Sequence, residues 1–185
     1  MTAFALPPEE VLRARQKLVL DHFHDEVRHA WDDVLATFPH PRYELVAPMT
    51  VHDGDEAVRG YYAATRTAFP DQDHEIIAFR HSADAVIVEF WLTGTQLGPF
   101  GAIPATGGRH RTRMTAYFVF DEHETLVAER IYFDQLTVLR QLLGSLDRRK
   151  PRHLILLARA VLGMLRMAGR EPDPRLTATT PPELT

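Results

Sequence analysis

The stretch ERIYFDQLTVLRQLLG, residues 129–144, places one carboxylate, Asp134, between a strand-like run and a helix-like run. Packing a carboxylate against Tyr132, Phe133 and Leu136 removes its hydration, which raises its pKa toward neutrality. Such a group can take and return a proton at working pH, as proton abstraction next to a carbonyl requires. Alternatively, Asp134 caps the helix that follows. The two roles can coexist, so Asp134 is the first catalytic candidate.

The alternation of side chains along this predicted strand groups the neighbours of Asp134. Tyr132 and Arg130 share its parity, so all three are predicted on one face. The Tyr132 phenol either donates a hydrogen bond to an enolate oxygen as part of a substrate-binding site or packs as a core aromatic. Glu129 falls on the opposite face and is predicted to be a cross-strand charge partner.

A second catalytic candidate, His52, precedes a predicted helix over residues 54–69. Histidine is the side chain whose ordinary pKa lies closest to neutral pH. In the other interpretation, Asp53 and Asp55 cap that helix and His52 lies in the turn.

Four further side chains are candidates for substrate binding. Gln96 can orient a carbonyl group but cannot titrate, and Trp91 either walls an apolar ligand or packs in the core. Phe100 lies in GPFGAIPATGG, residues 98–108, whose glycines and prolines are typical of a mobile rim over a cavity mouth. Tyr61, from the predicted helix, completes the set.

The segment DHFHDEVRH, residues 21–29, raises the question of a metal site. On a helix, His22 pairs with Glu26 and Asp25 pairs with His29. A helical pair without a third ligand is a weak metal signal, and a solvated polar face explains the same pattern. The chain has no cysteine, which excludes thiolate ligands and disulfides. We therefore predict no metal.

These candidates are positioned by helices that precede a sheet. Apolar residues recur at the helical period over residues 9–38, as one helix or two in series. A short strand-like stretch and the helix over 54–69 follow. Four runs then have strand character, at residues 74–82, 84–98, 111–122 and 125–134. This order predicts an α+β fold, with a curved antiparallel sheet wrapped over the N-terminal helices around an apolar interior.

The order of elements resembles the NTF2-like superfamily of cone-shaped α+β folds. Within it, residues 94–144 look like the SnoaL-like, or ester cyclase, group of polyketide cyclases. The similarity is carried by the loop GTQLGPFGAIPATGG, the strand AERIYFD and the RQL of the next helix. A helix followed by FPD is also similar, so the likeness spans roughly residues 10–145.

This resemblance implies an enzyme of the cyclase or isomerase type that acts on a small hydrophobic, polyketide-like carbonyl compound without metal or cofactor. Asp134 matches the group's general acid/base for intramolecular aldol closure. Gln96 stands where the group often has histidine, which removes a possible titrating group. The resemblance also implies a homodimer. Because the superfamily includes non-catalytic members, a ligand-binding protein or dimeric scaffold is the alternative.

Length and charge give the broad organisation. The chain has 185 residues and a formal net charge of −4, which predicts one domain, residues 1–145, an additional helix, residues 146–170, and a loose, proline-rich tail, residues 171–185. Basic residues are not clustered in the predicted domain, so no nucleic-acid partner is expected. The first residues, MTAFALPPEEVLRAR, lack a basic start and apolar core, so we expect no secretory signal and a cytoplasmic protein.

The additional helix is apolar from Leu154 to Gly169 apart from Arg159 and Arg166, and basic residues precede it. Two arginines within this stretch argue against a membrane span. The helix is predicted either to dock on the body or on a second subunit, or to make peripheral membrane contact through residues 150–169.

Overall fold

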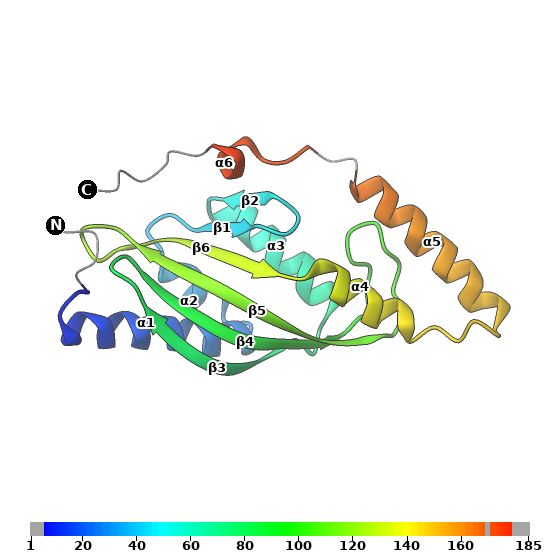
Figure 1. The fold of residues 1–185 in the computed structure, drawn as a ribbon, viewed down its shortest axis with the longest axis horizontal. Helices are drawn as coiled ribbons and strands as arrows, with labels where there is room; N and C mark the ends of the chain where they lie inside the picture. Colours follow the sequence, from blue (N-terminus) through cyan, green and yellow to red (C-terminus); the bar gives the residue numbers. More distant parts are fainter. Residues whose placement is uncertain (1–5, 169–170, 179–185) are drawn as a thin grey trace.

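The computed structural model describes residues 6–168 and 171–178. Figure 1 shows the predicted α+β fold, in which one curved, open sheet carries helices against one face. The helices are α1 (Glu9–Val27), α2 (Trp31–Ala36), α3 (Asp55–Ala68), α4 (Gln135–Gly144), α5 (Pro151–Ala168) and α6 (Pro174–Thr177). The strands are β1 (Arg42–Leu45), β2 (Thr50–Asp53), β3 (Asp73–His81), β4 (Ala85–Thr95), β5 (Arg109–Phe120) and β6 (Leu126–Phe133), in the sheet order β2-β1-β6-β5-β4-β3.

The N-terminal helical region is two helices, because the chain turns after Val27. His29 has a φ of 59°, in the left-handed region that interrupts a helix. The Ala30 N–H still donates to the Asp25 carbonyl at 2.9 Å, and α2 begins at the next residue, Trp31. This turn lays α2 against α1.

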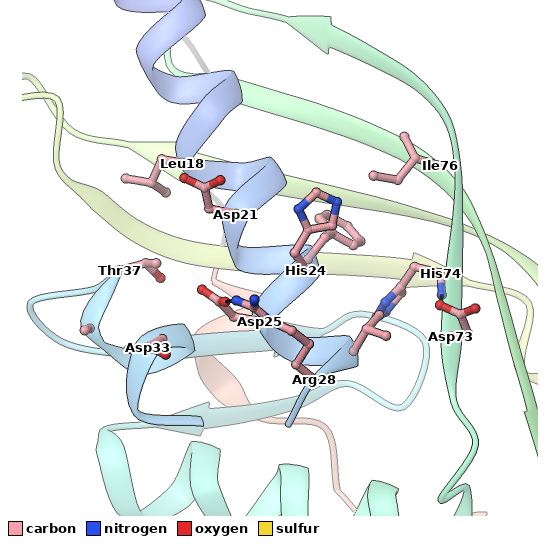
Figure 2. Close-up of a pocket in the computed structure, with 13 residues that line it drawn as sticks. Leu18, Asp21, His24, Asp25, Arg28, Asp33, Thr37, Asp73, His74 and Ile76 are labelled. Carbon is pink, nitrogen blue, oxygen red and sulfur yellow. Dashed lines mark hydrogen bonds and ion pairs between the residues drawn. The ribbon is translucent and has the colours of Figure 1, made fainter. Parts of the chain in front are cut away.

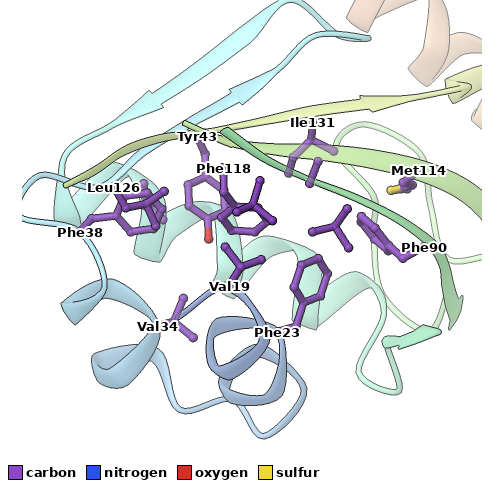
Figure 3. Close-up of a cluster of buried hydrophobic side chains, with 14 of the residues drawn as sticks. Val19, Phe23, Val34, Phe38, Tyr43, Phe90, Met114, Phe118, Leu126 and Ile131 are labelled. Atoms are coloured by element: carbon purple, nitrogen blue, oxygen red, sulfur yellow. The ribbon is translucent and has the colours of Figure 1, made fainter. Parts of the chain in front are cut away.

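The core lies between these helices and the inner face of the sheet (Figure 3). The predicted apolar faces of β4 and β5 meet there, with Val86, Val88 and Phe90 opposite Phe118, Ala116 and Met114. Alternation along each strand places all six on one face. Val19 and Phe23 of α1 cover them.

The four predicted strand runs pair antiparallel, as β3 to β6, and the strand-like stretch before α3 adds one parallel pairing to the sheet. β1 runs parallel to β6, with Glu44 opposite Arg130, and only its hairpin partner β2 is antiparallel to it. After α1 and α2, the chain reaches the edge of the sheet that is formed by the last strand, β6. β1 and β2 therefore extend the sheet beyond β6 and continue the wall of the cone.

The additional helix is present as α5, and it packs on the loop between β4 and β5. A Cβ at Gly163 would lie 2.3 Å from the Ala102 carbonyl oxygen, and one at Gly101 would lie 2.9 Å from the Met167 sulfur. These glycines therefore permit a close contact between helix and loop. Docking on the body, one of the alternatives predicted for this helix, is what the structure shows.

Part of the predicted loose tail is held against the body. The Asp173 N–H donates to the Met49 carbonyl at 2.9 Å, and the Arg175 guanidinium binds the Asp53 carboxylate at 2.6 Å. Figure 1 shows this segment, with α6, lying over β2. The prediction of a loose tail is wrong for residues 171–178, because an ion pair and a capped turn hold this segment although it has little apolar surface to bury. Residues 179–185 lie outside the described part.

Gly163→Ala tests the packing of α5. Overpacking costs about 1–3 kcal/mol, so amide hydrogen exchange in α5 should accelerate by about tenfold or more. Gly60→Ala is the matched control, because a Cβ there meets nothing within 4 Å and alanine favours a helix interior by about 1 kcal/mol. Unchanged or slower exchange in α5 of Gly163→Ala would contradict the close contact.

Candidate functional site

A cavity of about 420 Å³ lies inside the cone and is lined mainly by apolar and aromatic side chains. Among its polar side chains, five that converge on one part of the cavity come from five elements. They are Glu26 of α1, Tyr43 of β1, Tyr62 of α3, His74 of β3 and Glu129 of β6. An apolar cavity of this size with a few converging polar groups is typical of a small-molecule site.

His22, one helical turn before Glu26, stands behind this cavity wall and is 1% exposed. The Thr37 hydroxyl donates its proton to the Val34 carbonyl at 2.6 Å. Its oxygen must therefore accept the hydrogen bond that joins it to His22 Nδ1 at 3.1 Å. Nδ1 of His22 carries a proton.

The other ring nitrogen is fixed by two tyrosines. The Tyr62 hydroxyl donates to Glu26 Oε1 at 2.6 Å and is also hydrogen-bonded to the Tyr43 hydroxyl. Because the Tyr62 proton is directed at Glu26, Tyr43 donates to Tyr62 and accepts from His22 Nε2 at 2.8 Å. Both ring nitrogens of His22 are donors, which makes the ring an imidazolium.

The imidazolium faces two buried carboxyl groups, at 3.5 Å from Glu129 Oε2 and 3.9 Å from Glu26 Oε1. Burial lowers the pKa of His22, but the close contact with Glu129 and the charge of that carboxylate outweigh burial and leave this pKa raised. Burial and then the Glu129 charge raise the pKa of Glu26. The environment therefore favours a proton on Glu26. Among the described residues, Glu129 Oε2 has no hydrogen-bond partner.

His74 extends the network, with Nε2 at 3.3 Å from Glu26 Oε2. Burial, with smaller effects from Arg66 and His22, lowers the pKa of His74 to about 3, so its ring is neutral. A neutral ring can accept the Glu26 proton at Nε2. Within the described part of the chain, His74 Nδ1 has no hydrogen-bond partner. The chain of contacts from Glu26 to His74 therefore ends at an unpaired ring nitrogen.

The same cluster is the place where a metal ion would fit best. One ligand atom each from His22, Glu26 and Glu129 lies within 4.8 Å of the others. A metal needs a ring nitrogen with a free lone pair, whereas both nitrogens of His22 donate hydrogen bonds. Metal binding would therefore require deprotonation of His22 and loss of its bond to Tyr43.

Asp134 lies outside this site, and the prediction of a buried acid is wrong. Its side chain is exposed and caps α4, accepting from the backbone N–H of Leu136 at 2.9 Å and of Thr137 at 3.1 Å. The Thr137 hydroxyl, then these backbone groups, lower the pKa of Asp134. The capping interpretation is the one that the structure supports, because β6 ends at Phe133 and leaves Asp134 in solvent.

Three predicted substrate-binding residues also lie away from the cavity. Tyr132 is 42% exposed on the outer face, and Trp91 lies on the same side beneath the Arg111 guanidinium, 4.1 Å from the ring centroid. Gln96 is fully buried but holds the loop, because its side chain binds the Pro104 carbonyl and the Thr106 hydroxyl. The alternation of side chains along each strand places Tyr132 and Trp91 on the outer face. Gln96 is held away from the cavity by its hydrogen bonds within the loop.

The other predicted site residues do line the cavity. His52 and Tyr61 pack ring against ring, with centroids 4.9 Å apart, and burial lowers the pKa of His52. Phe100 lies in the wall with Gly101 and Met167, which places the loop and the end of α5 at one margin of the cavity. The placement of the loop agrees with the predicted rim, while its mobility stays a prediction.

The predicted solvated face of α1 is divided between two surroundings. Figure 2 shows His24, Asp25 and Arg28 in a second, open groove of about 1080 Å³ between α1, α2 and β3. His22 and Glu26 instead point into the cone, at 1% and 8% exposure. The prediction of a solvated face is therefore right for the first group and wrong for the second.

Several cavity residues that sequence reasoning missed lie on one strand, β6. Glu129, Ile131 and Phe133 of β6 lie opposite Phe118, Ala116 and Met114 of β5, the predicted inner face. Parity separates Glu129 from Tyr132, as predicted, but the role predicted for Glu129 is a cross-strand charge partner and not a cavity residue. Matching the apolar residues of β6 to those of β5 is the signal that assigns Glu129 to the interior.

With this geometry in view, comparison with known proteins identifies the class. Residues 18–142 match the family described as SnoaL-like polyketide cyclase, and the chain belongs to that family. No curated protein matches the sequence.

Solved structures share the fold. A candidate SnoaL-like polyketide cyclase from Jannaschia sp. CCS1 is 21% identical with a TM-score of 0.64, over 75% of this chain and 97% of that one. IdmH, a candidate polyketide cyclase from Streptomyces antibioticus, is 18% identical with a TM-score of 0.58, over 69% and 97%. A ketosteroid isomerase-like fold from Catenulispora acidiphila is 17% identical with a TM-score of 0.57, over 67% and 90%.

Glu26→Gln is expected to flatten the dependence of stability on pH. An acid with a raised folded-state pKa binds its proton more tightly when folded, so stability falls as pH rises from the unfolded pKa through the folded one. The raised pKa of His22 acts in the same direction, over a pH range that begins at the higher unfolded pKa of histidine. Urea unfolding across this pH range measures the slope, with the exposed Glu10→Gln as control; an unchanged slope would contradict a buried, protonated Glu26.

Asp134→Ala should lower the urea midpoint modestly, while Asp134→Asn, which retains an acceptor, should change it less. Because the folded-state pKa is lowered, the contribution is present at neutral pH and is lost as pH falls through that value. A stability difference that persists unchanged in acid would disagree with the capping role.

Proposed function

We propose that this protein is an acid/base enzyme, of the cyclase or isomerase type, that acts on a small hydrophobic, polyketide-like carbonyl compound. The observation that carries the proposal is the pair of buried carboxyl groups, Glu26 and Glu129, in an apolar cavity with different surroundings. Family membership supports the polyketide-like substrate class. Asp134 has no part in this proposal.

The two carboxyl groups differ in what holds them. Glu129 lies next to the His22 imidazolium, and its buried Oε2 accepts no hydrogen bond from the described residues, which suits a general base. Glu26 has a raised pKa, because burial and the Glu129 charge outweigh the hydrogen bond that Tyr62 donates to it, and a raised pKa suits a neutral donor. A neutral carboxyl group beside a carboxylate lets one site do both acid and base chemistry.

The proposed step starts with the Glu129 carboxylate removing a proton from the carbon next to a carbonyl. The C–H electron pair becomes the enolate double bond, and the oxygen accepts a hydrogen bond from the Glu26 carboxyl group, whose proton turns from His74 Nε2 to the substrate. In a cyclisation, the enolate carbon attacks a second carbonyl of the same molecule, and the new alkoxide takes the proton back from Glu129. In an isomerisation, Glu129 returns the proton to another carbon.

Deuterium exchange tests this step without knowledge of the natural product. An apolar cyclic ketone such as 2-tetralone, in D₂O, should exchange the hydrogens next to its carbonyl faster with the protein, and saturably. Glu129→Gln should lower that rate by about 10²–10⁴-fold, the usual contribution of a positioned base. NMR measures the exchange, and calorimetry shows whether the variant still binds the ketone.

The exposed Glu10→Gln and the helix-cap variant Asp134→Asn are the controls. Both should exchange the hydrogens of the ketone at the wild-type rate. Loss of exchange in Asp134→Asn with retained folding would transfer the role to Asp134. Saturable binding without any exchange by the wild type would overturn the enzyme proposal in favour of a ligand-binding protein.

A further inference from the structure

The surface of α5 that faces away from the body is apolar. The helix packs on the body through Ala160 and Gly163, which are buried. Large apolar side chains project from its opposite side, which we name the outer apolar row. The row comprises Leu154 (48% exposed), Ile155 (63%), Val161 (41%), Leu162 (49%) and Leu165 (66%). Contiguous exposed apolar surface of this kind marks an interaction site.

A basic row borders the outer apolar row. Arg152, Arg159 and Arg166 recur every seven residues, so they lie along one flank of the helix. Three more basic residues, at 148–150, precede α5, and residues 148–168 contain no acidic residue. The whole chain, by contrast, carries a formal charge of −4, so positive charge is concentrated beside the apolar row.

The positive charge of the basic row indicates which kind of partner binds this surface. In the described part of the chain, no helix is long and apolar enough to cross a membrane. Pairing with α5 of a second copy would cover the apolar row, but that helix offers no carboxylate to the arginines. An anionic lipid surface satisfies both rows, because acyl chains accept the apolar side chains and headgroups neutralise the arginines.

We propose that α5 docks the protein on an anionic membrane surface, with its axis in the plane of the interface. Met167 near the end of α5 and Gly101 of the loop beneath it both line the cavity. Docking through the outer apolar row therefore brings this margin of the cavity close to the membrane. The proposal depends on the surface alone and is independent of the chemistry inside the cone.

Vesicle co-sedimentation of the full chain tests the proposal. The protein should bind vesicles of equal parts phosphatidylcholine and phosphatidylglycerol, and bind phosphatidylcholine alone much more weakly. The triple variant Ile155→Ser, Leu162→Ser, Leu165→Ser should bind the mixed vesicles at least about a hundredfold more weakly, because it loses most of the apolar insertion. These side chains are exposed, so the fold should persist.

The triple variant Arg152→Gln, Arg159→Gln, Arg166→Gln should bind about a hundredfold more weakly, since each basic residue near an anionic surface contributes about a fivefold gain. High salt should reproduce this loss in the wild type. The charge-matched control, with glutamine at the exposed positions Arg13 and Lys17 of α1 and Arg28 directly after it, should bind as the wild type does.

A second control replaces exposed apolar residues elsewhere, with serine at Ile77, Val127 and Leu136, and should also leave vesicle binding unchanged. Equal losses in the controls and the α5 variants would overturn the assignment to α5. Absence of vesicle binding would overturn the proposal. If sedimentation velocity then showed a dimer that the α5 serine variant dissociates, the row would be a subunit interface instead.

Discussion

The interior of this protein is organised around one buried cation, the imidazolium of His22, and the two carboxyl groups that face it. Charged groups inside a protein are stable only when they are paired and hydrogen-bonded. Here Thr37 and Tyr43 accept the two ring protons, and Glu129 supplies the opposing charge. Removing either acceptor or the carboxylate would leave a buried ion uncompensated, so the cluster constrains how the surrounding elements meet.

This constraint explains why a polar cluster is compatible with an apolar cone. Its members come from two helices and three strands, and the apolar core side chains exclude water around them. The low polarity that stabilises the core also raises the pKa of Glu26 and strengthens the attraction between His22 and Glu129. The same packing therefore supports both the fold and the separation of two carboxyl groups into an acid and a base.

The margin of the cavity is built differently, from backbone contacts. Gln96 closes the loop through its hydrogen bonds to Pro104 and Thr106, and α5 rests on that loop at Gly163. Neither contact requires apolar burial of the outer side of α5, which explains how the helix can be held to the body and still present an apolar surface. The family model, residues 18–142, ends before α5, so the helix lies beyond the matched region.

The sequence by itself determined most of the elements, their order and the alternation of side chains along each strand. It separated Glu129 from Tyr132 and gave helix capping as one of two roles for Asp134, because strand parity and capping depend on neighbouring residues alone. The tertiary structure decided which face of β6 is the inside, since pairing with β5 and with β1 sets that choice. It also decided that His22 and Glu26 enter the cone while His24 remains in the open groove. Local sequence carries no record of those long-range contacts, because a polar residue on an amphipathic helix has the same local pattern whether water or a buried partner faces it.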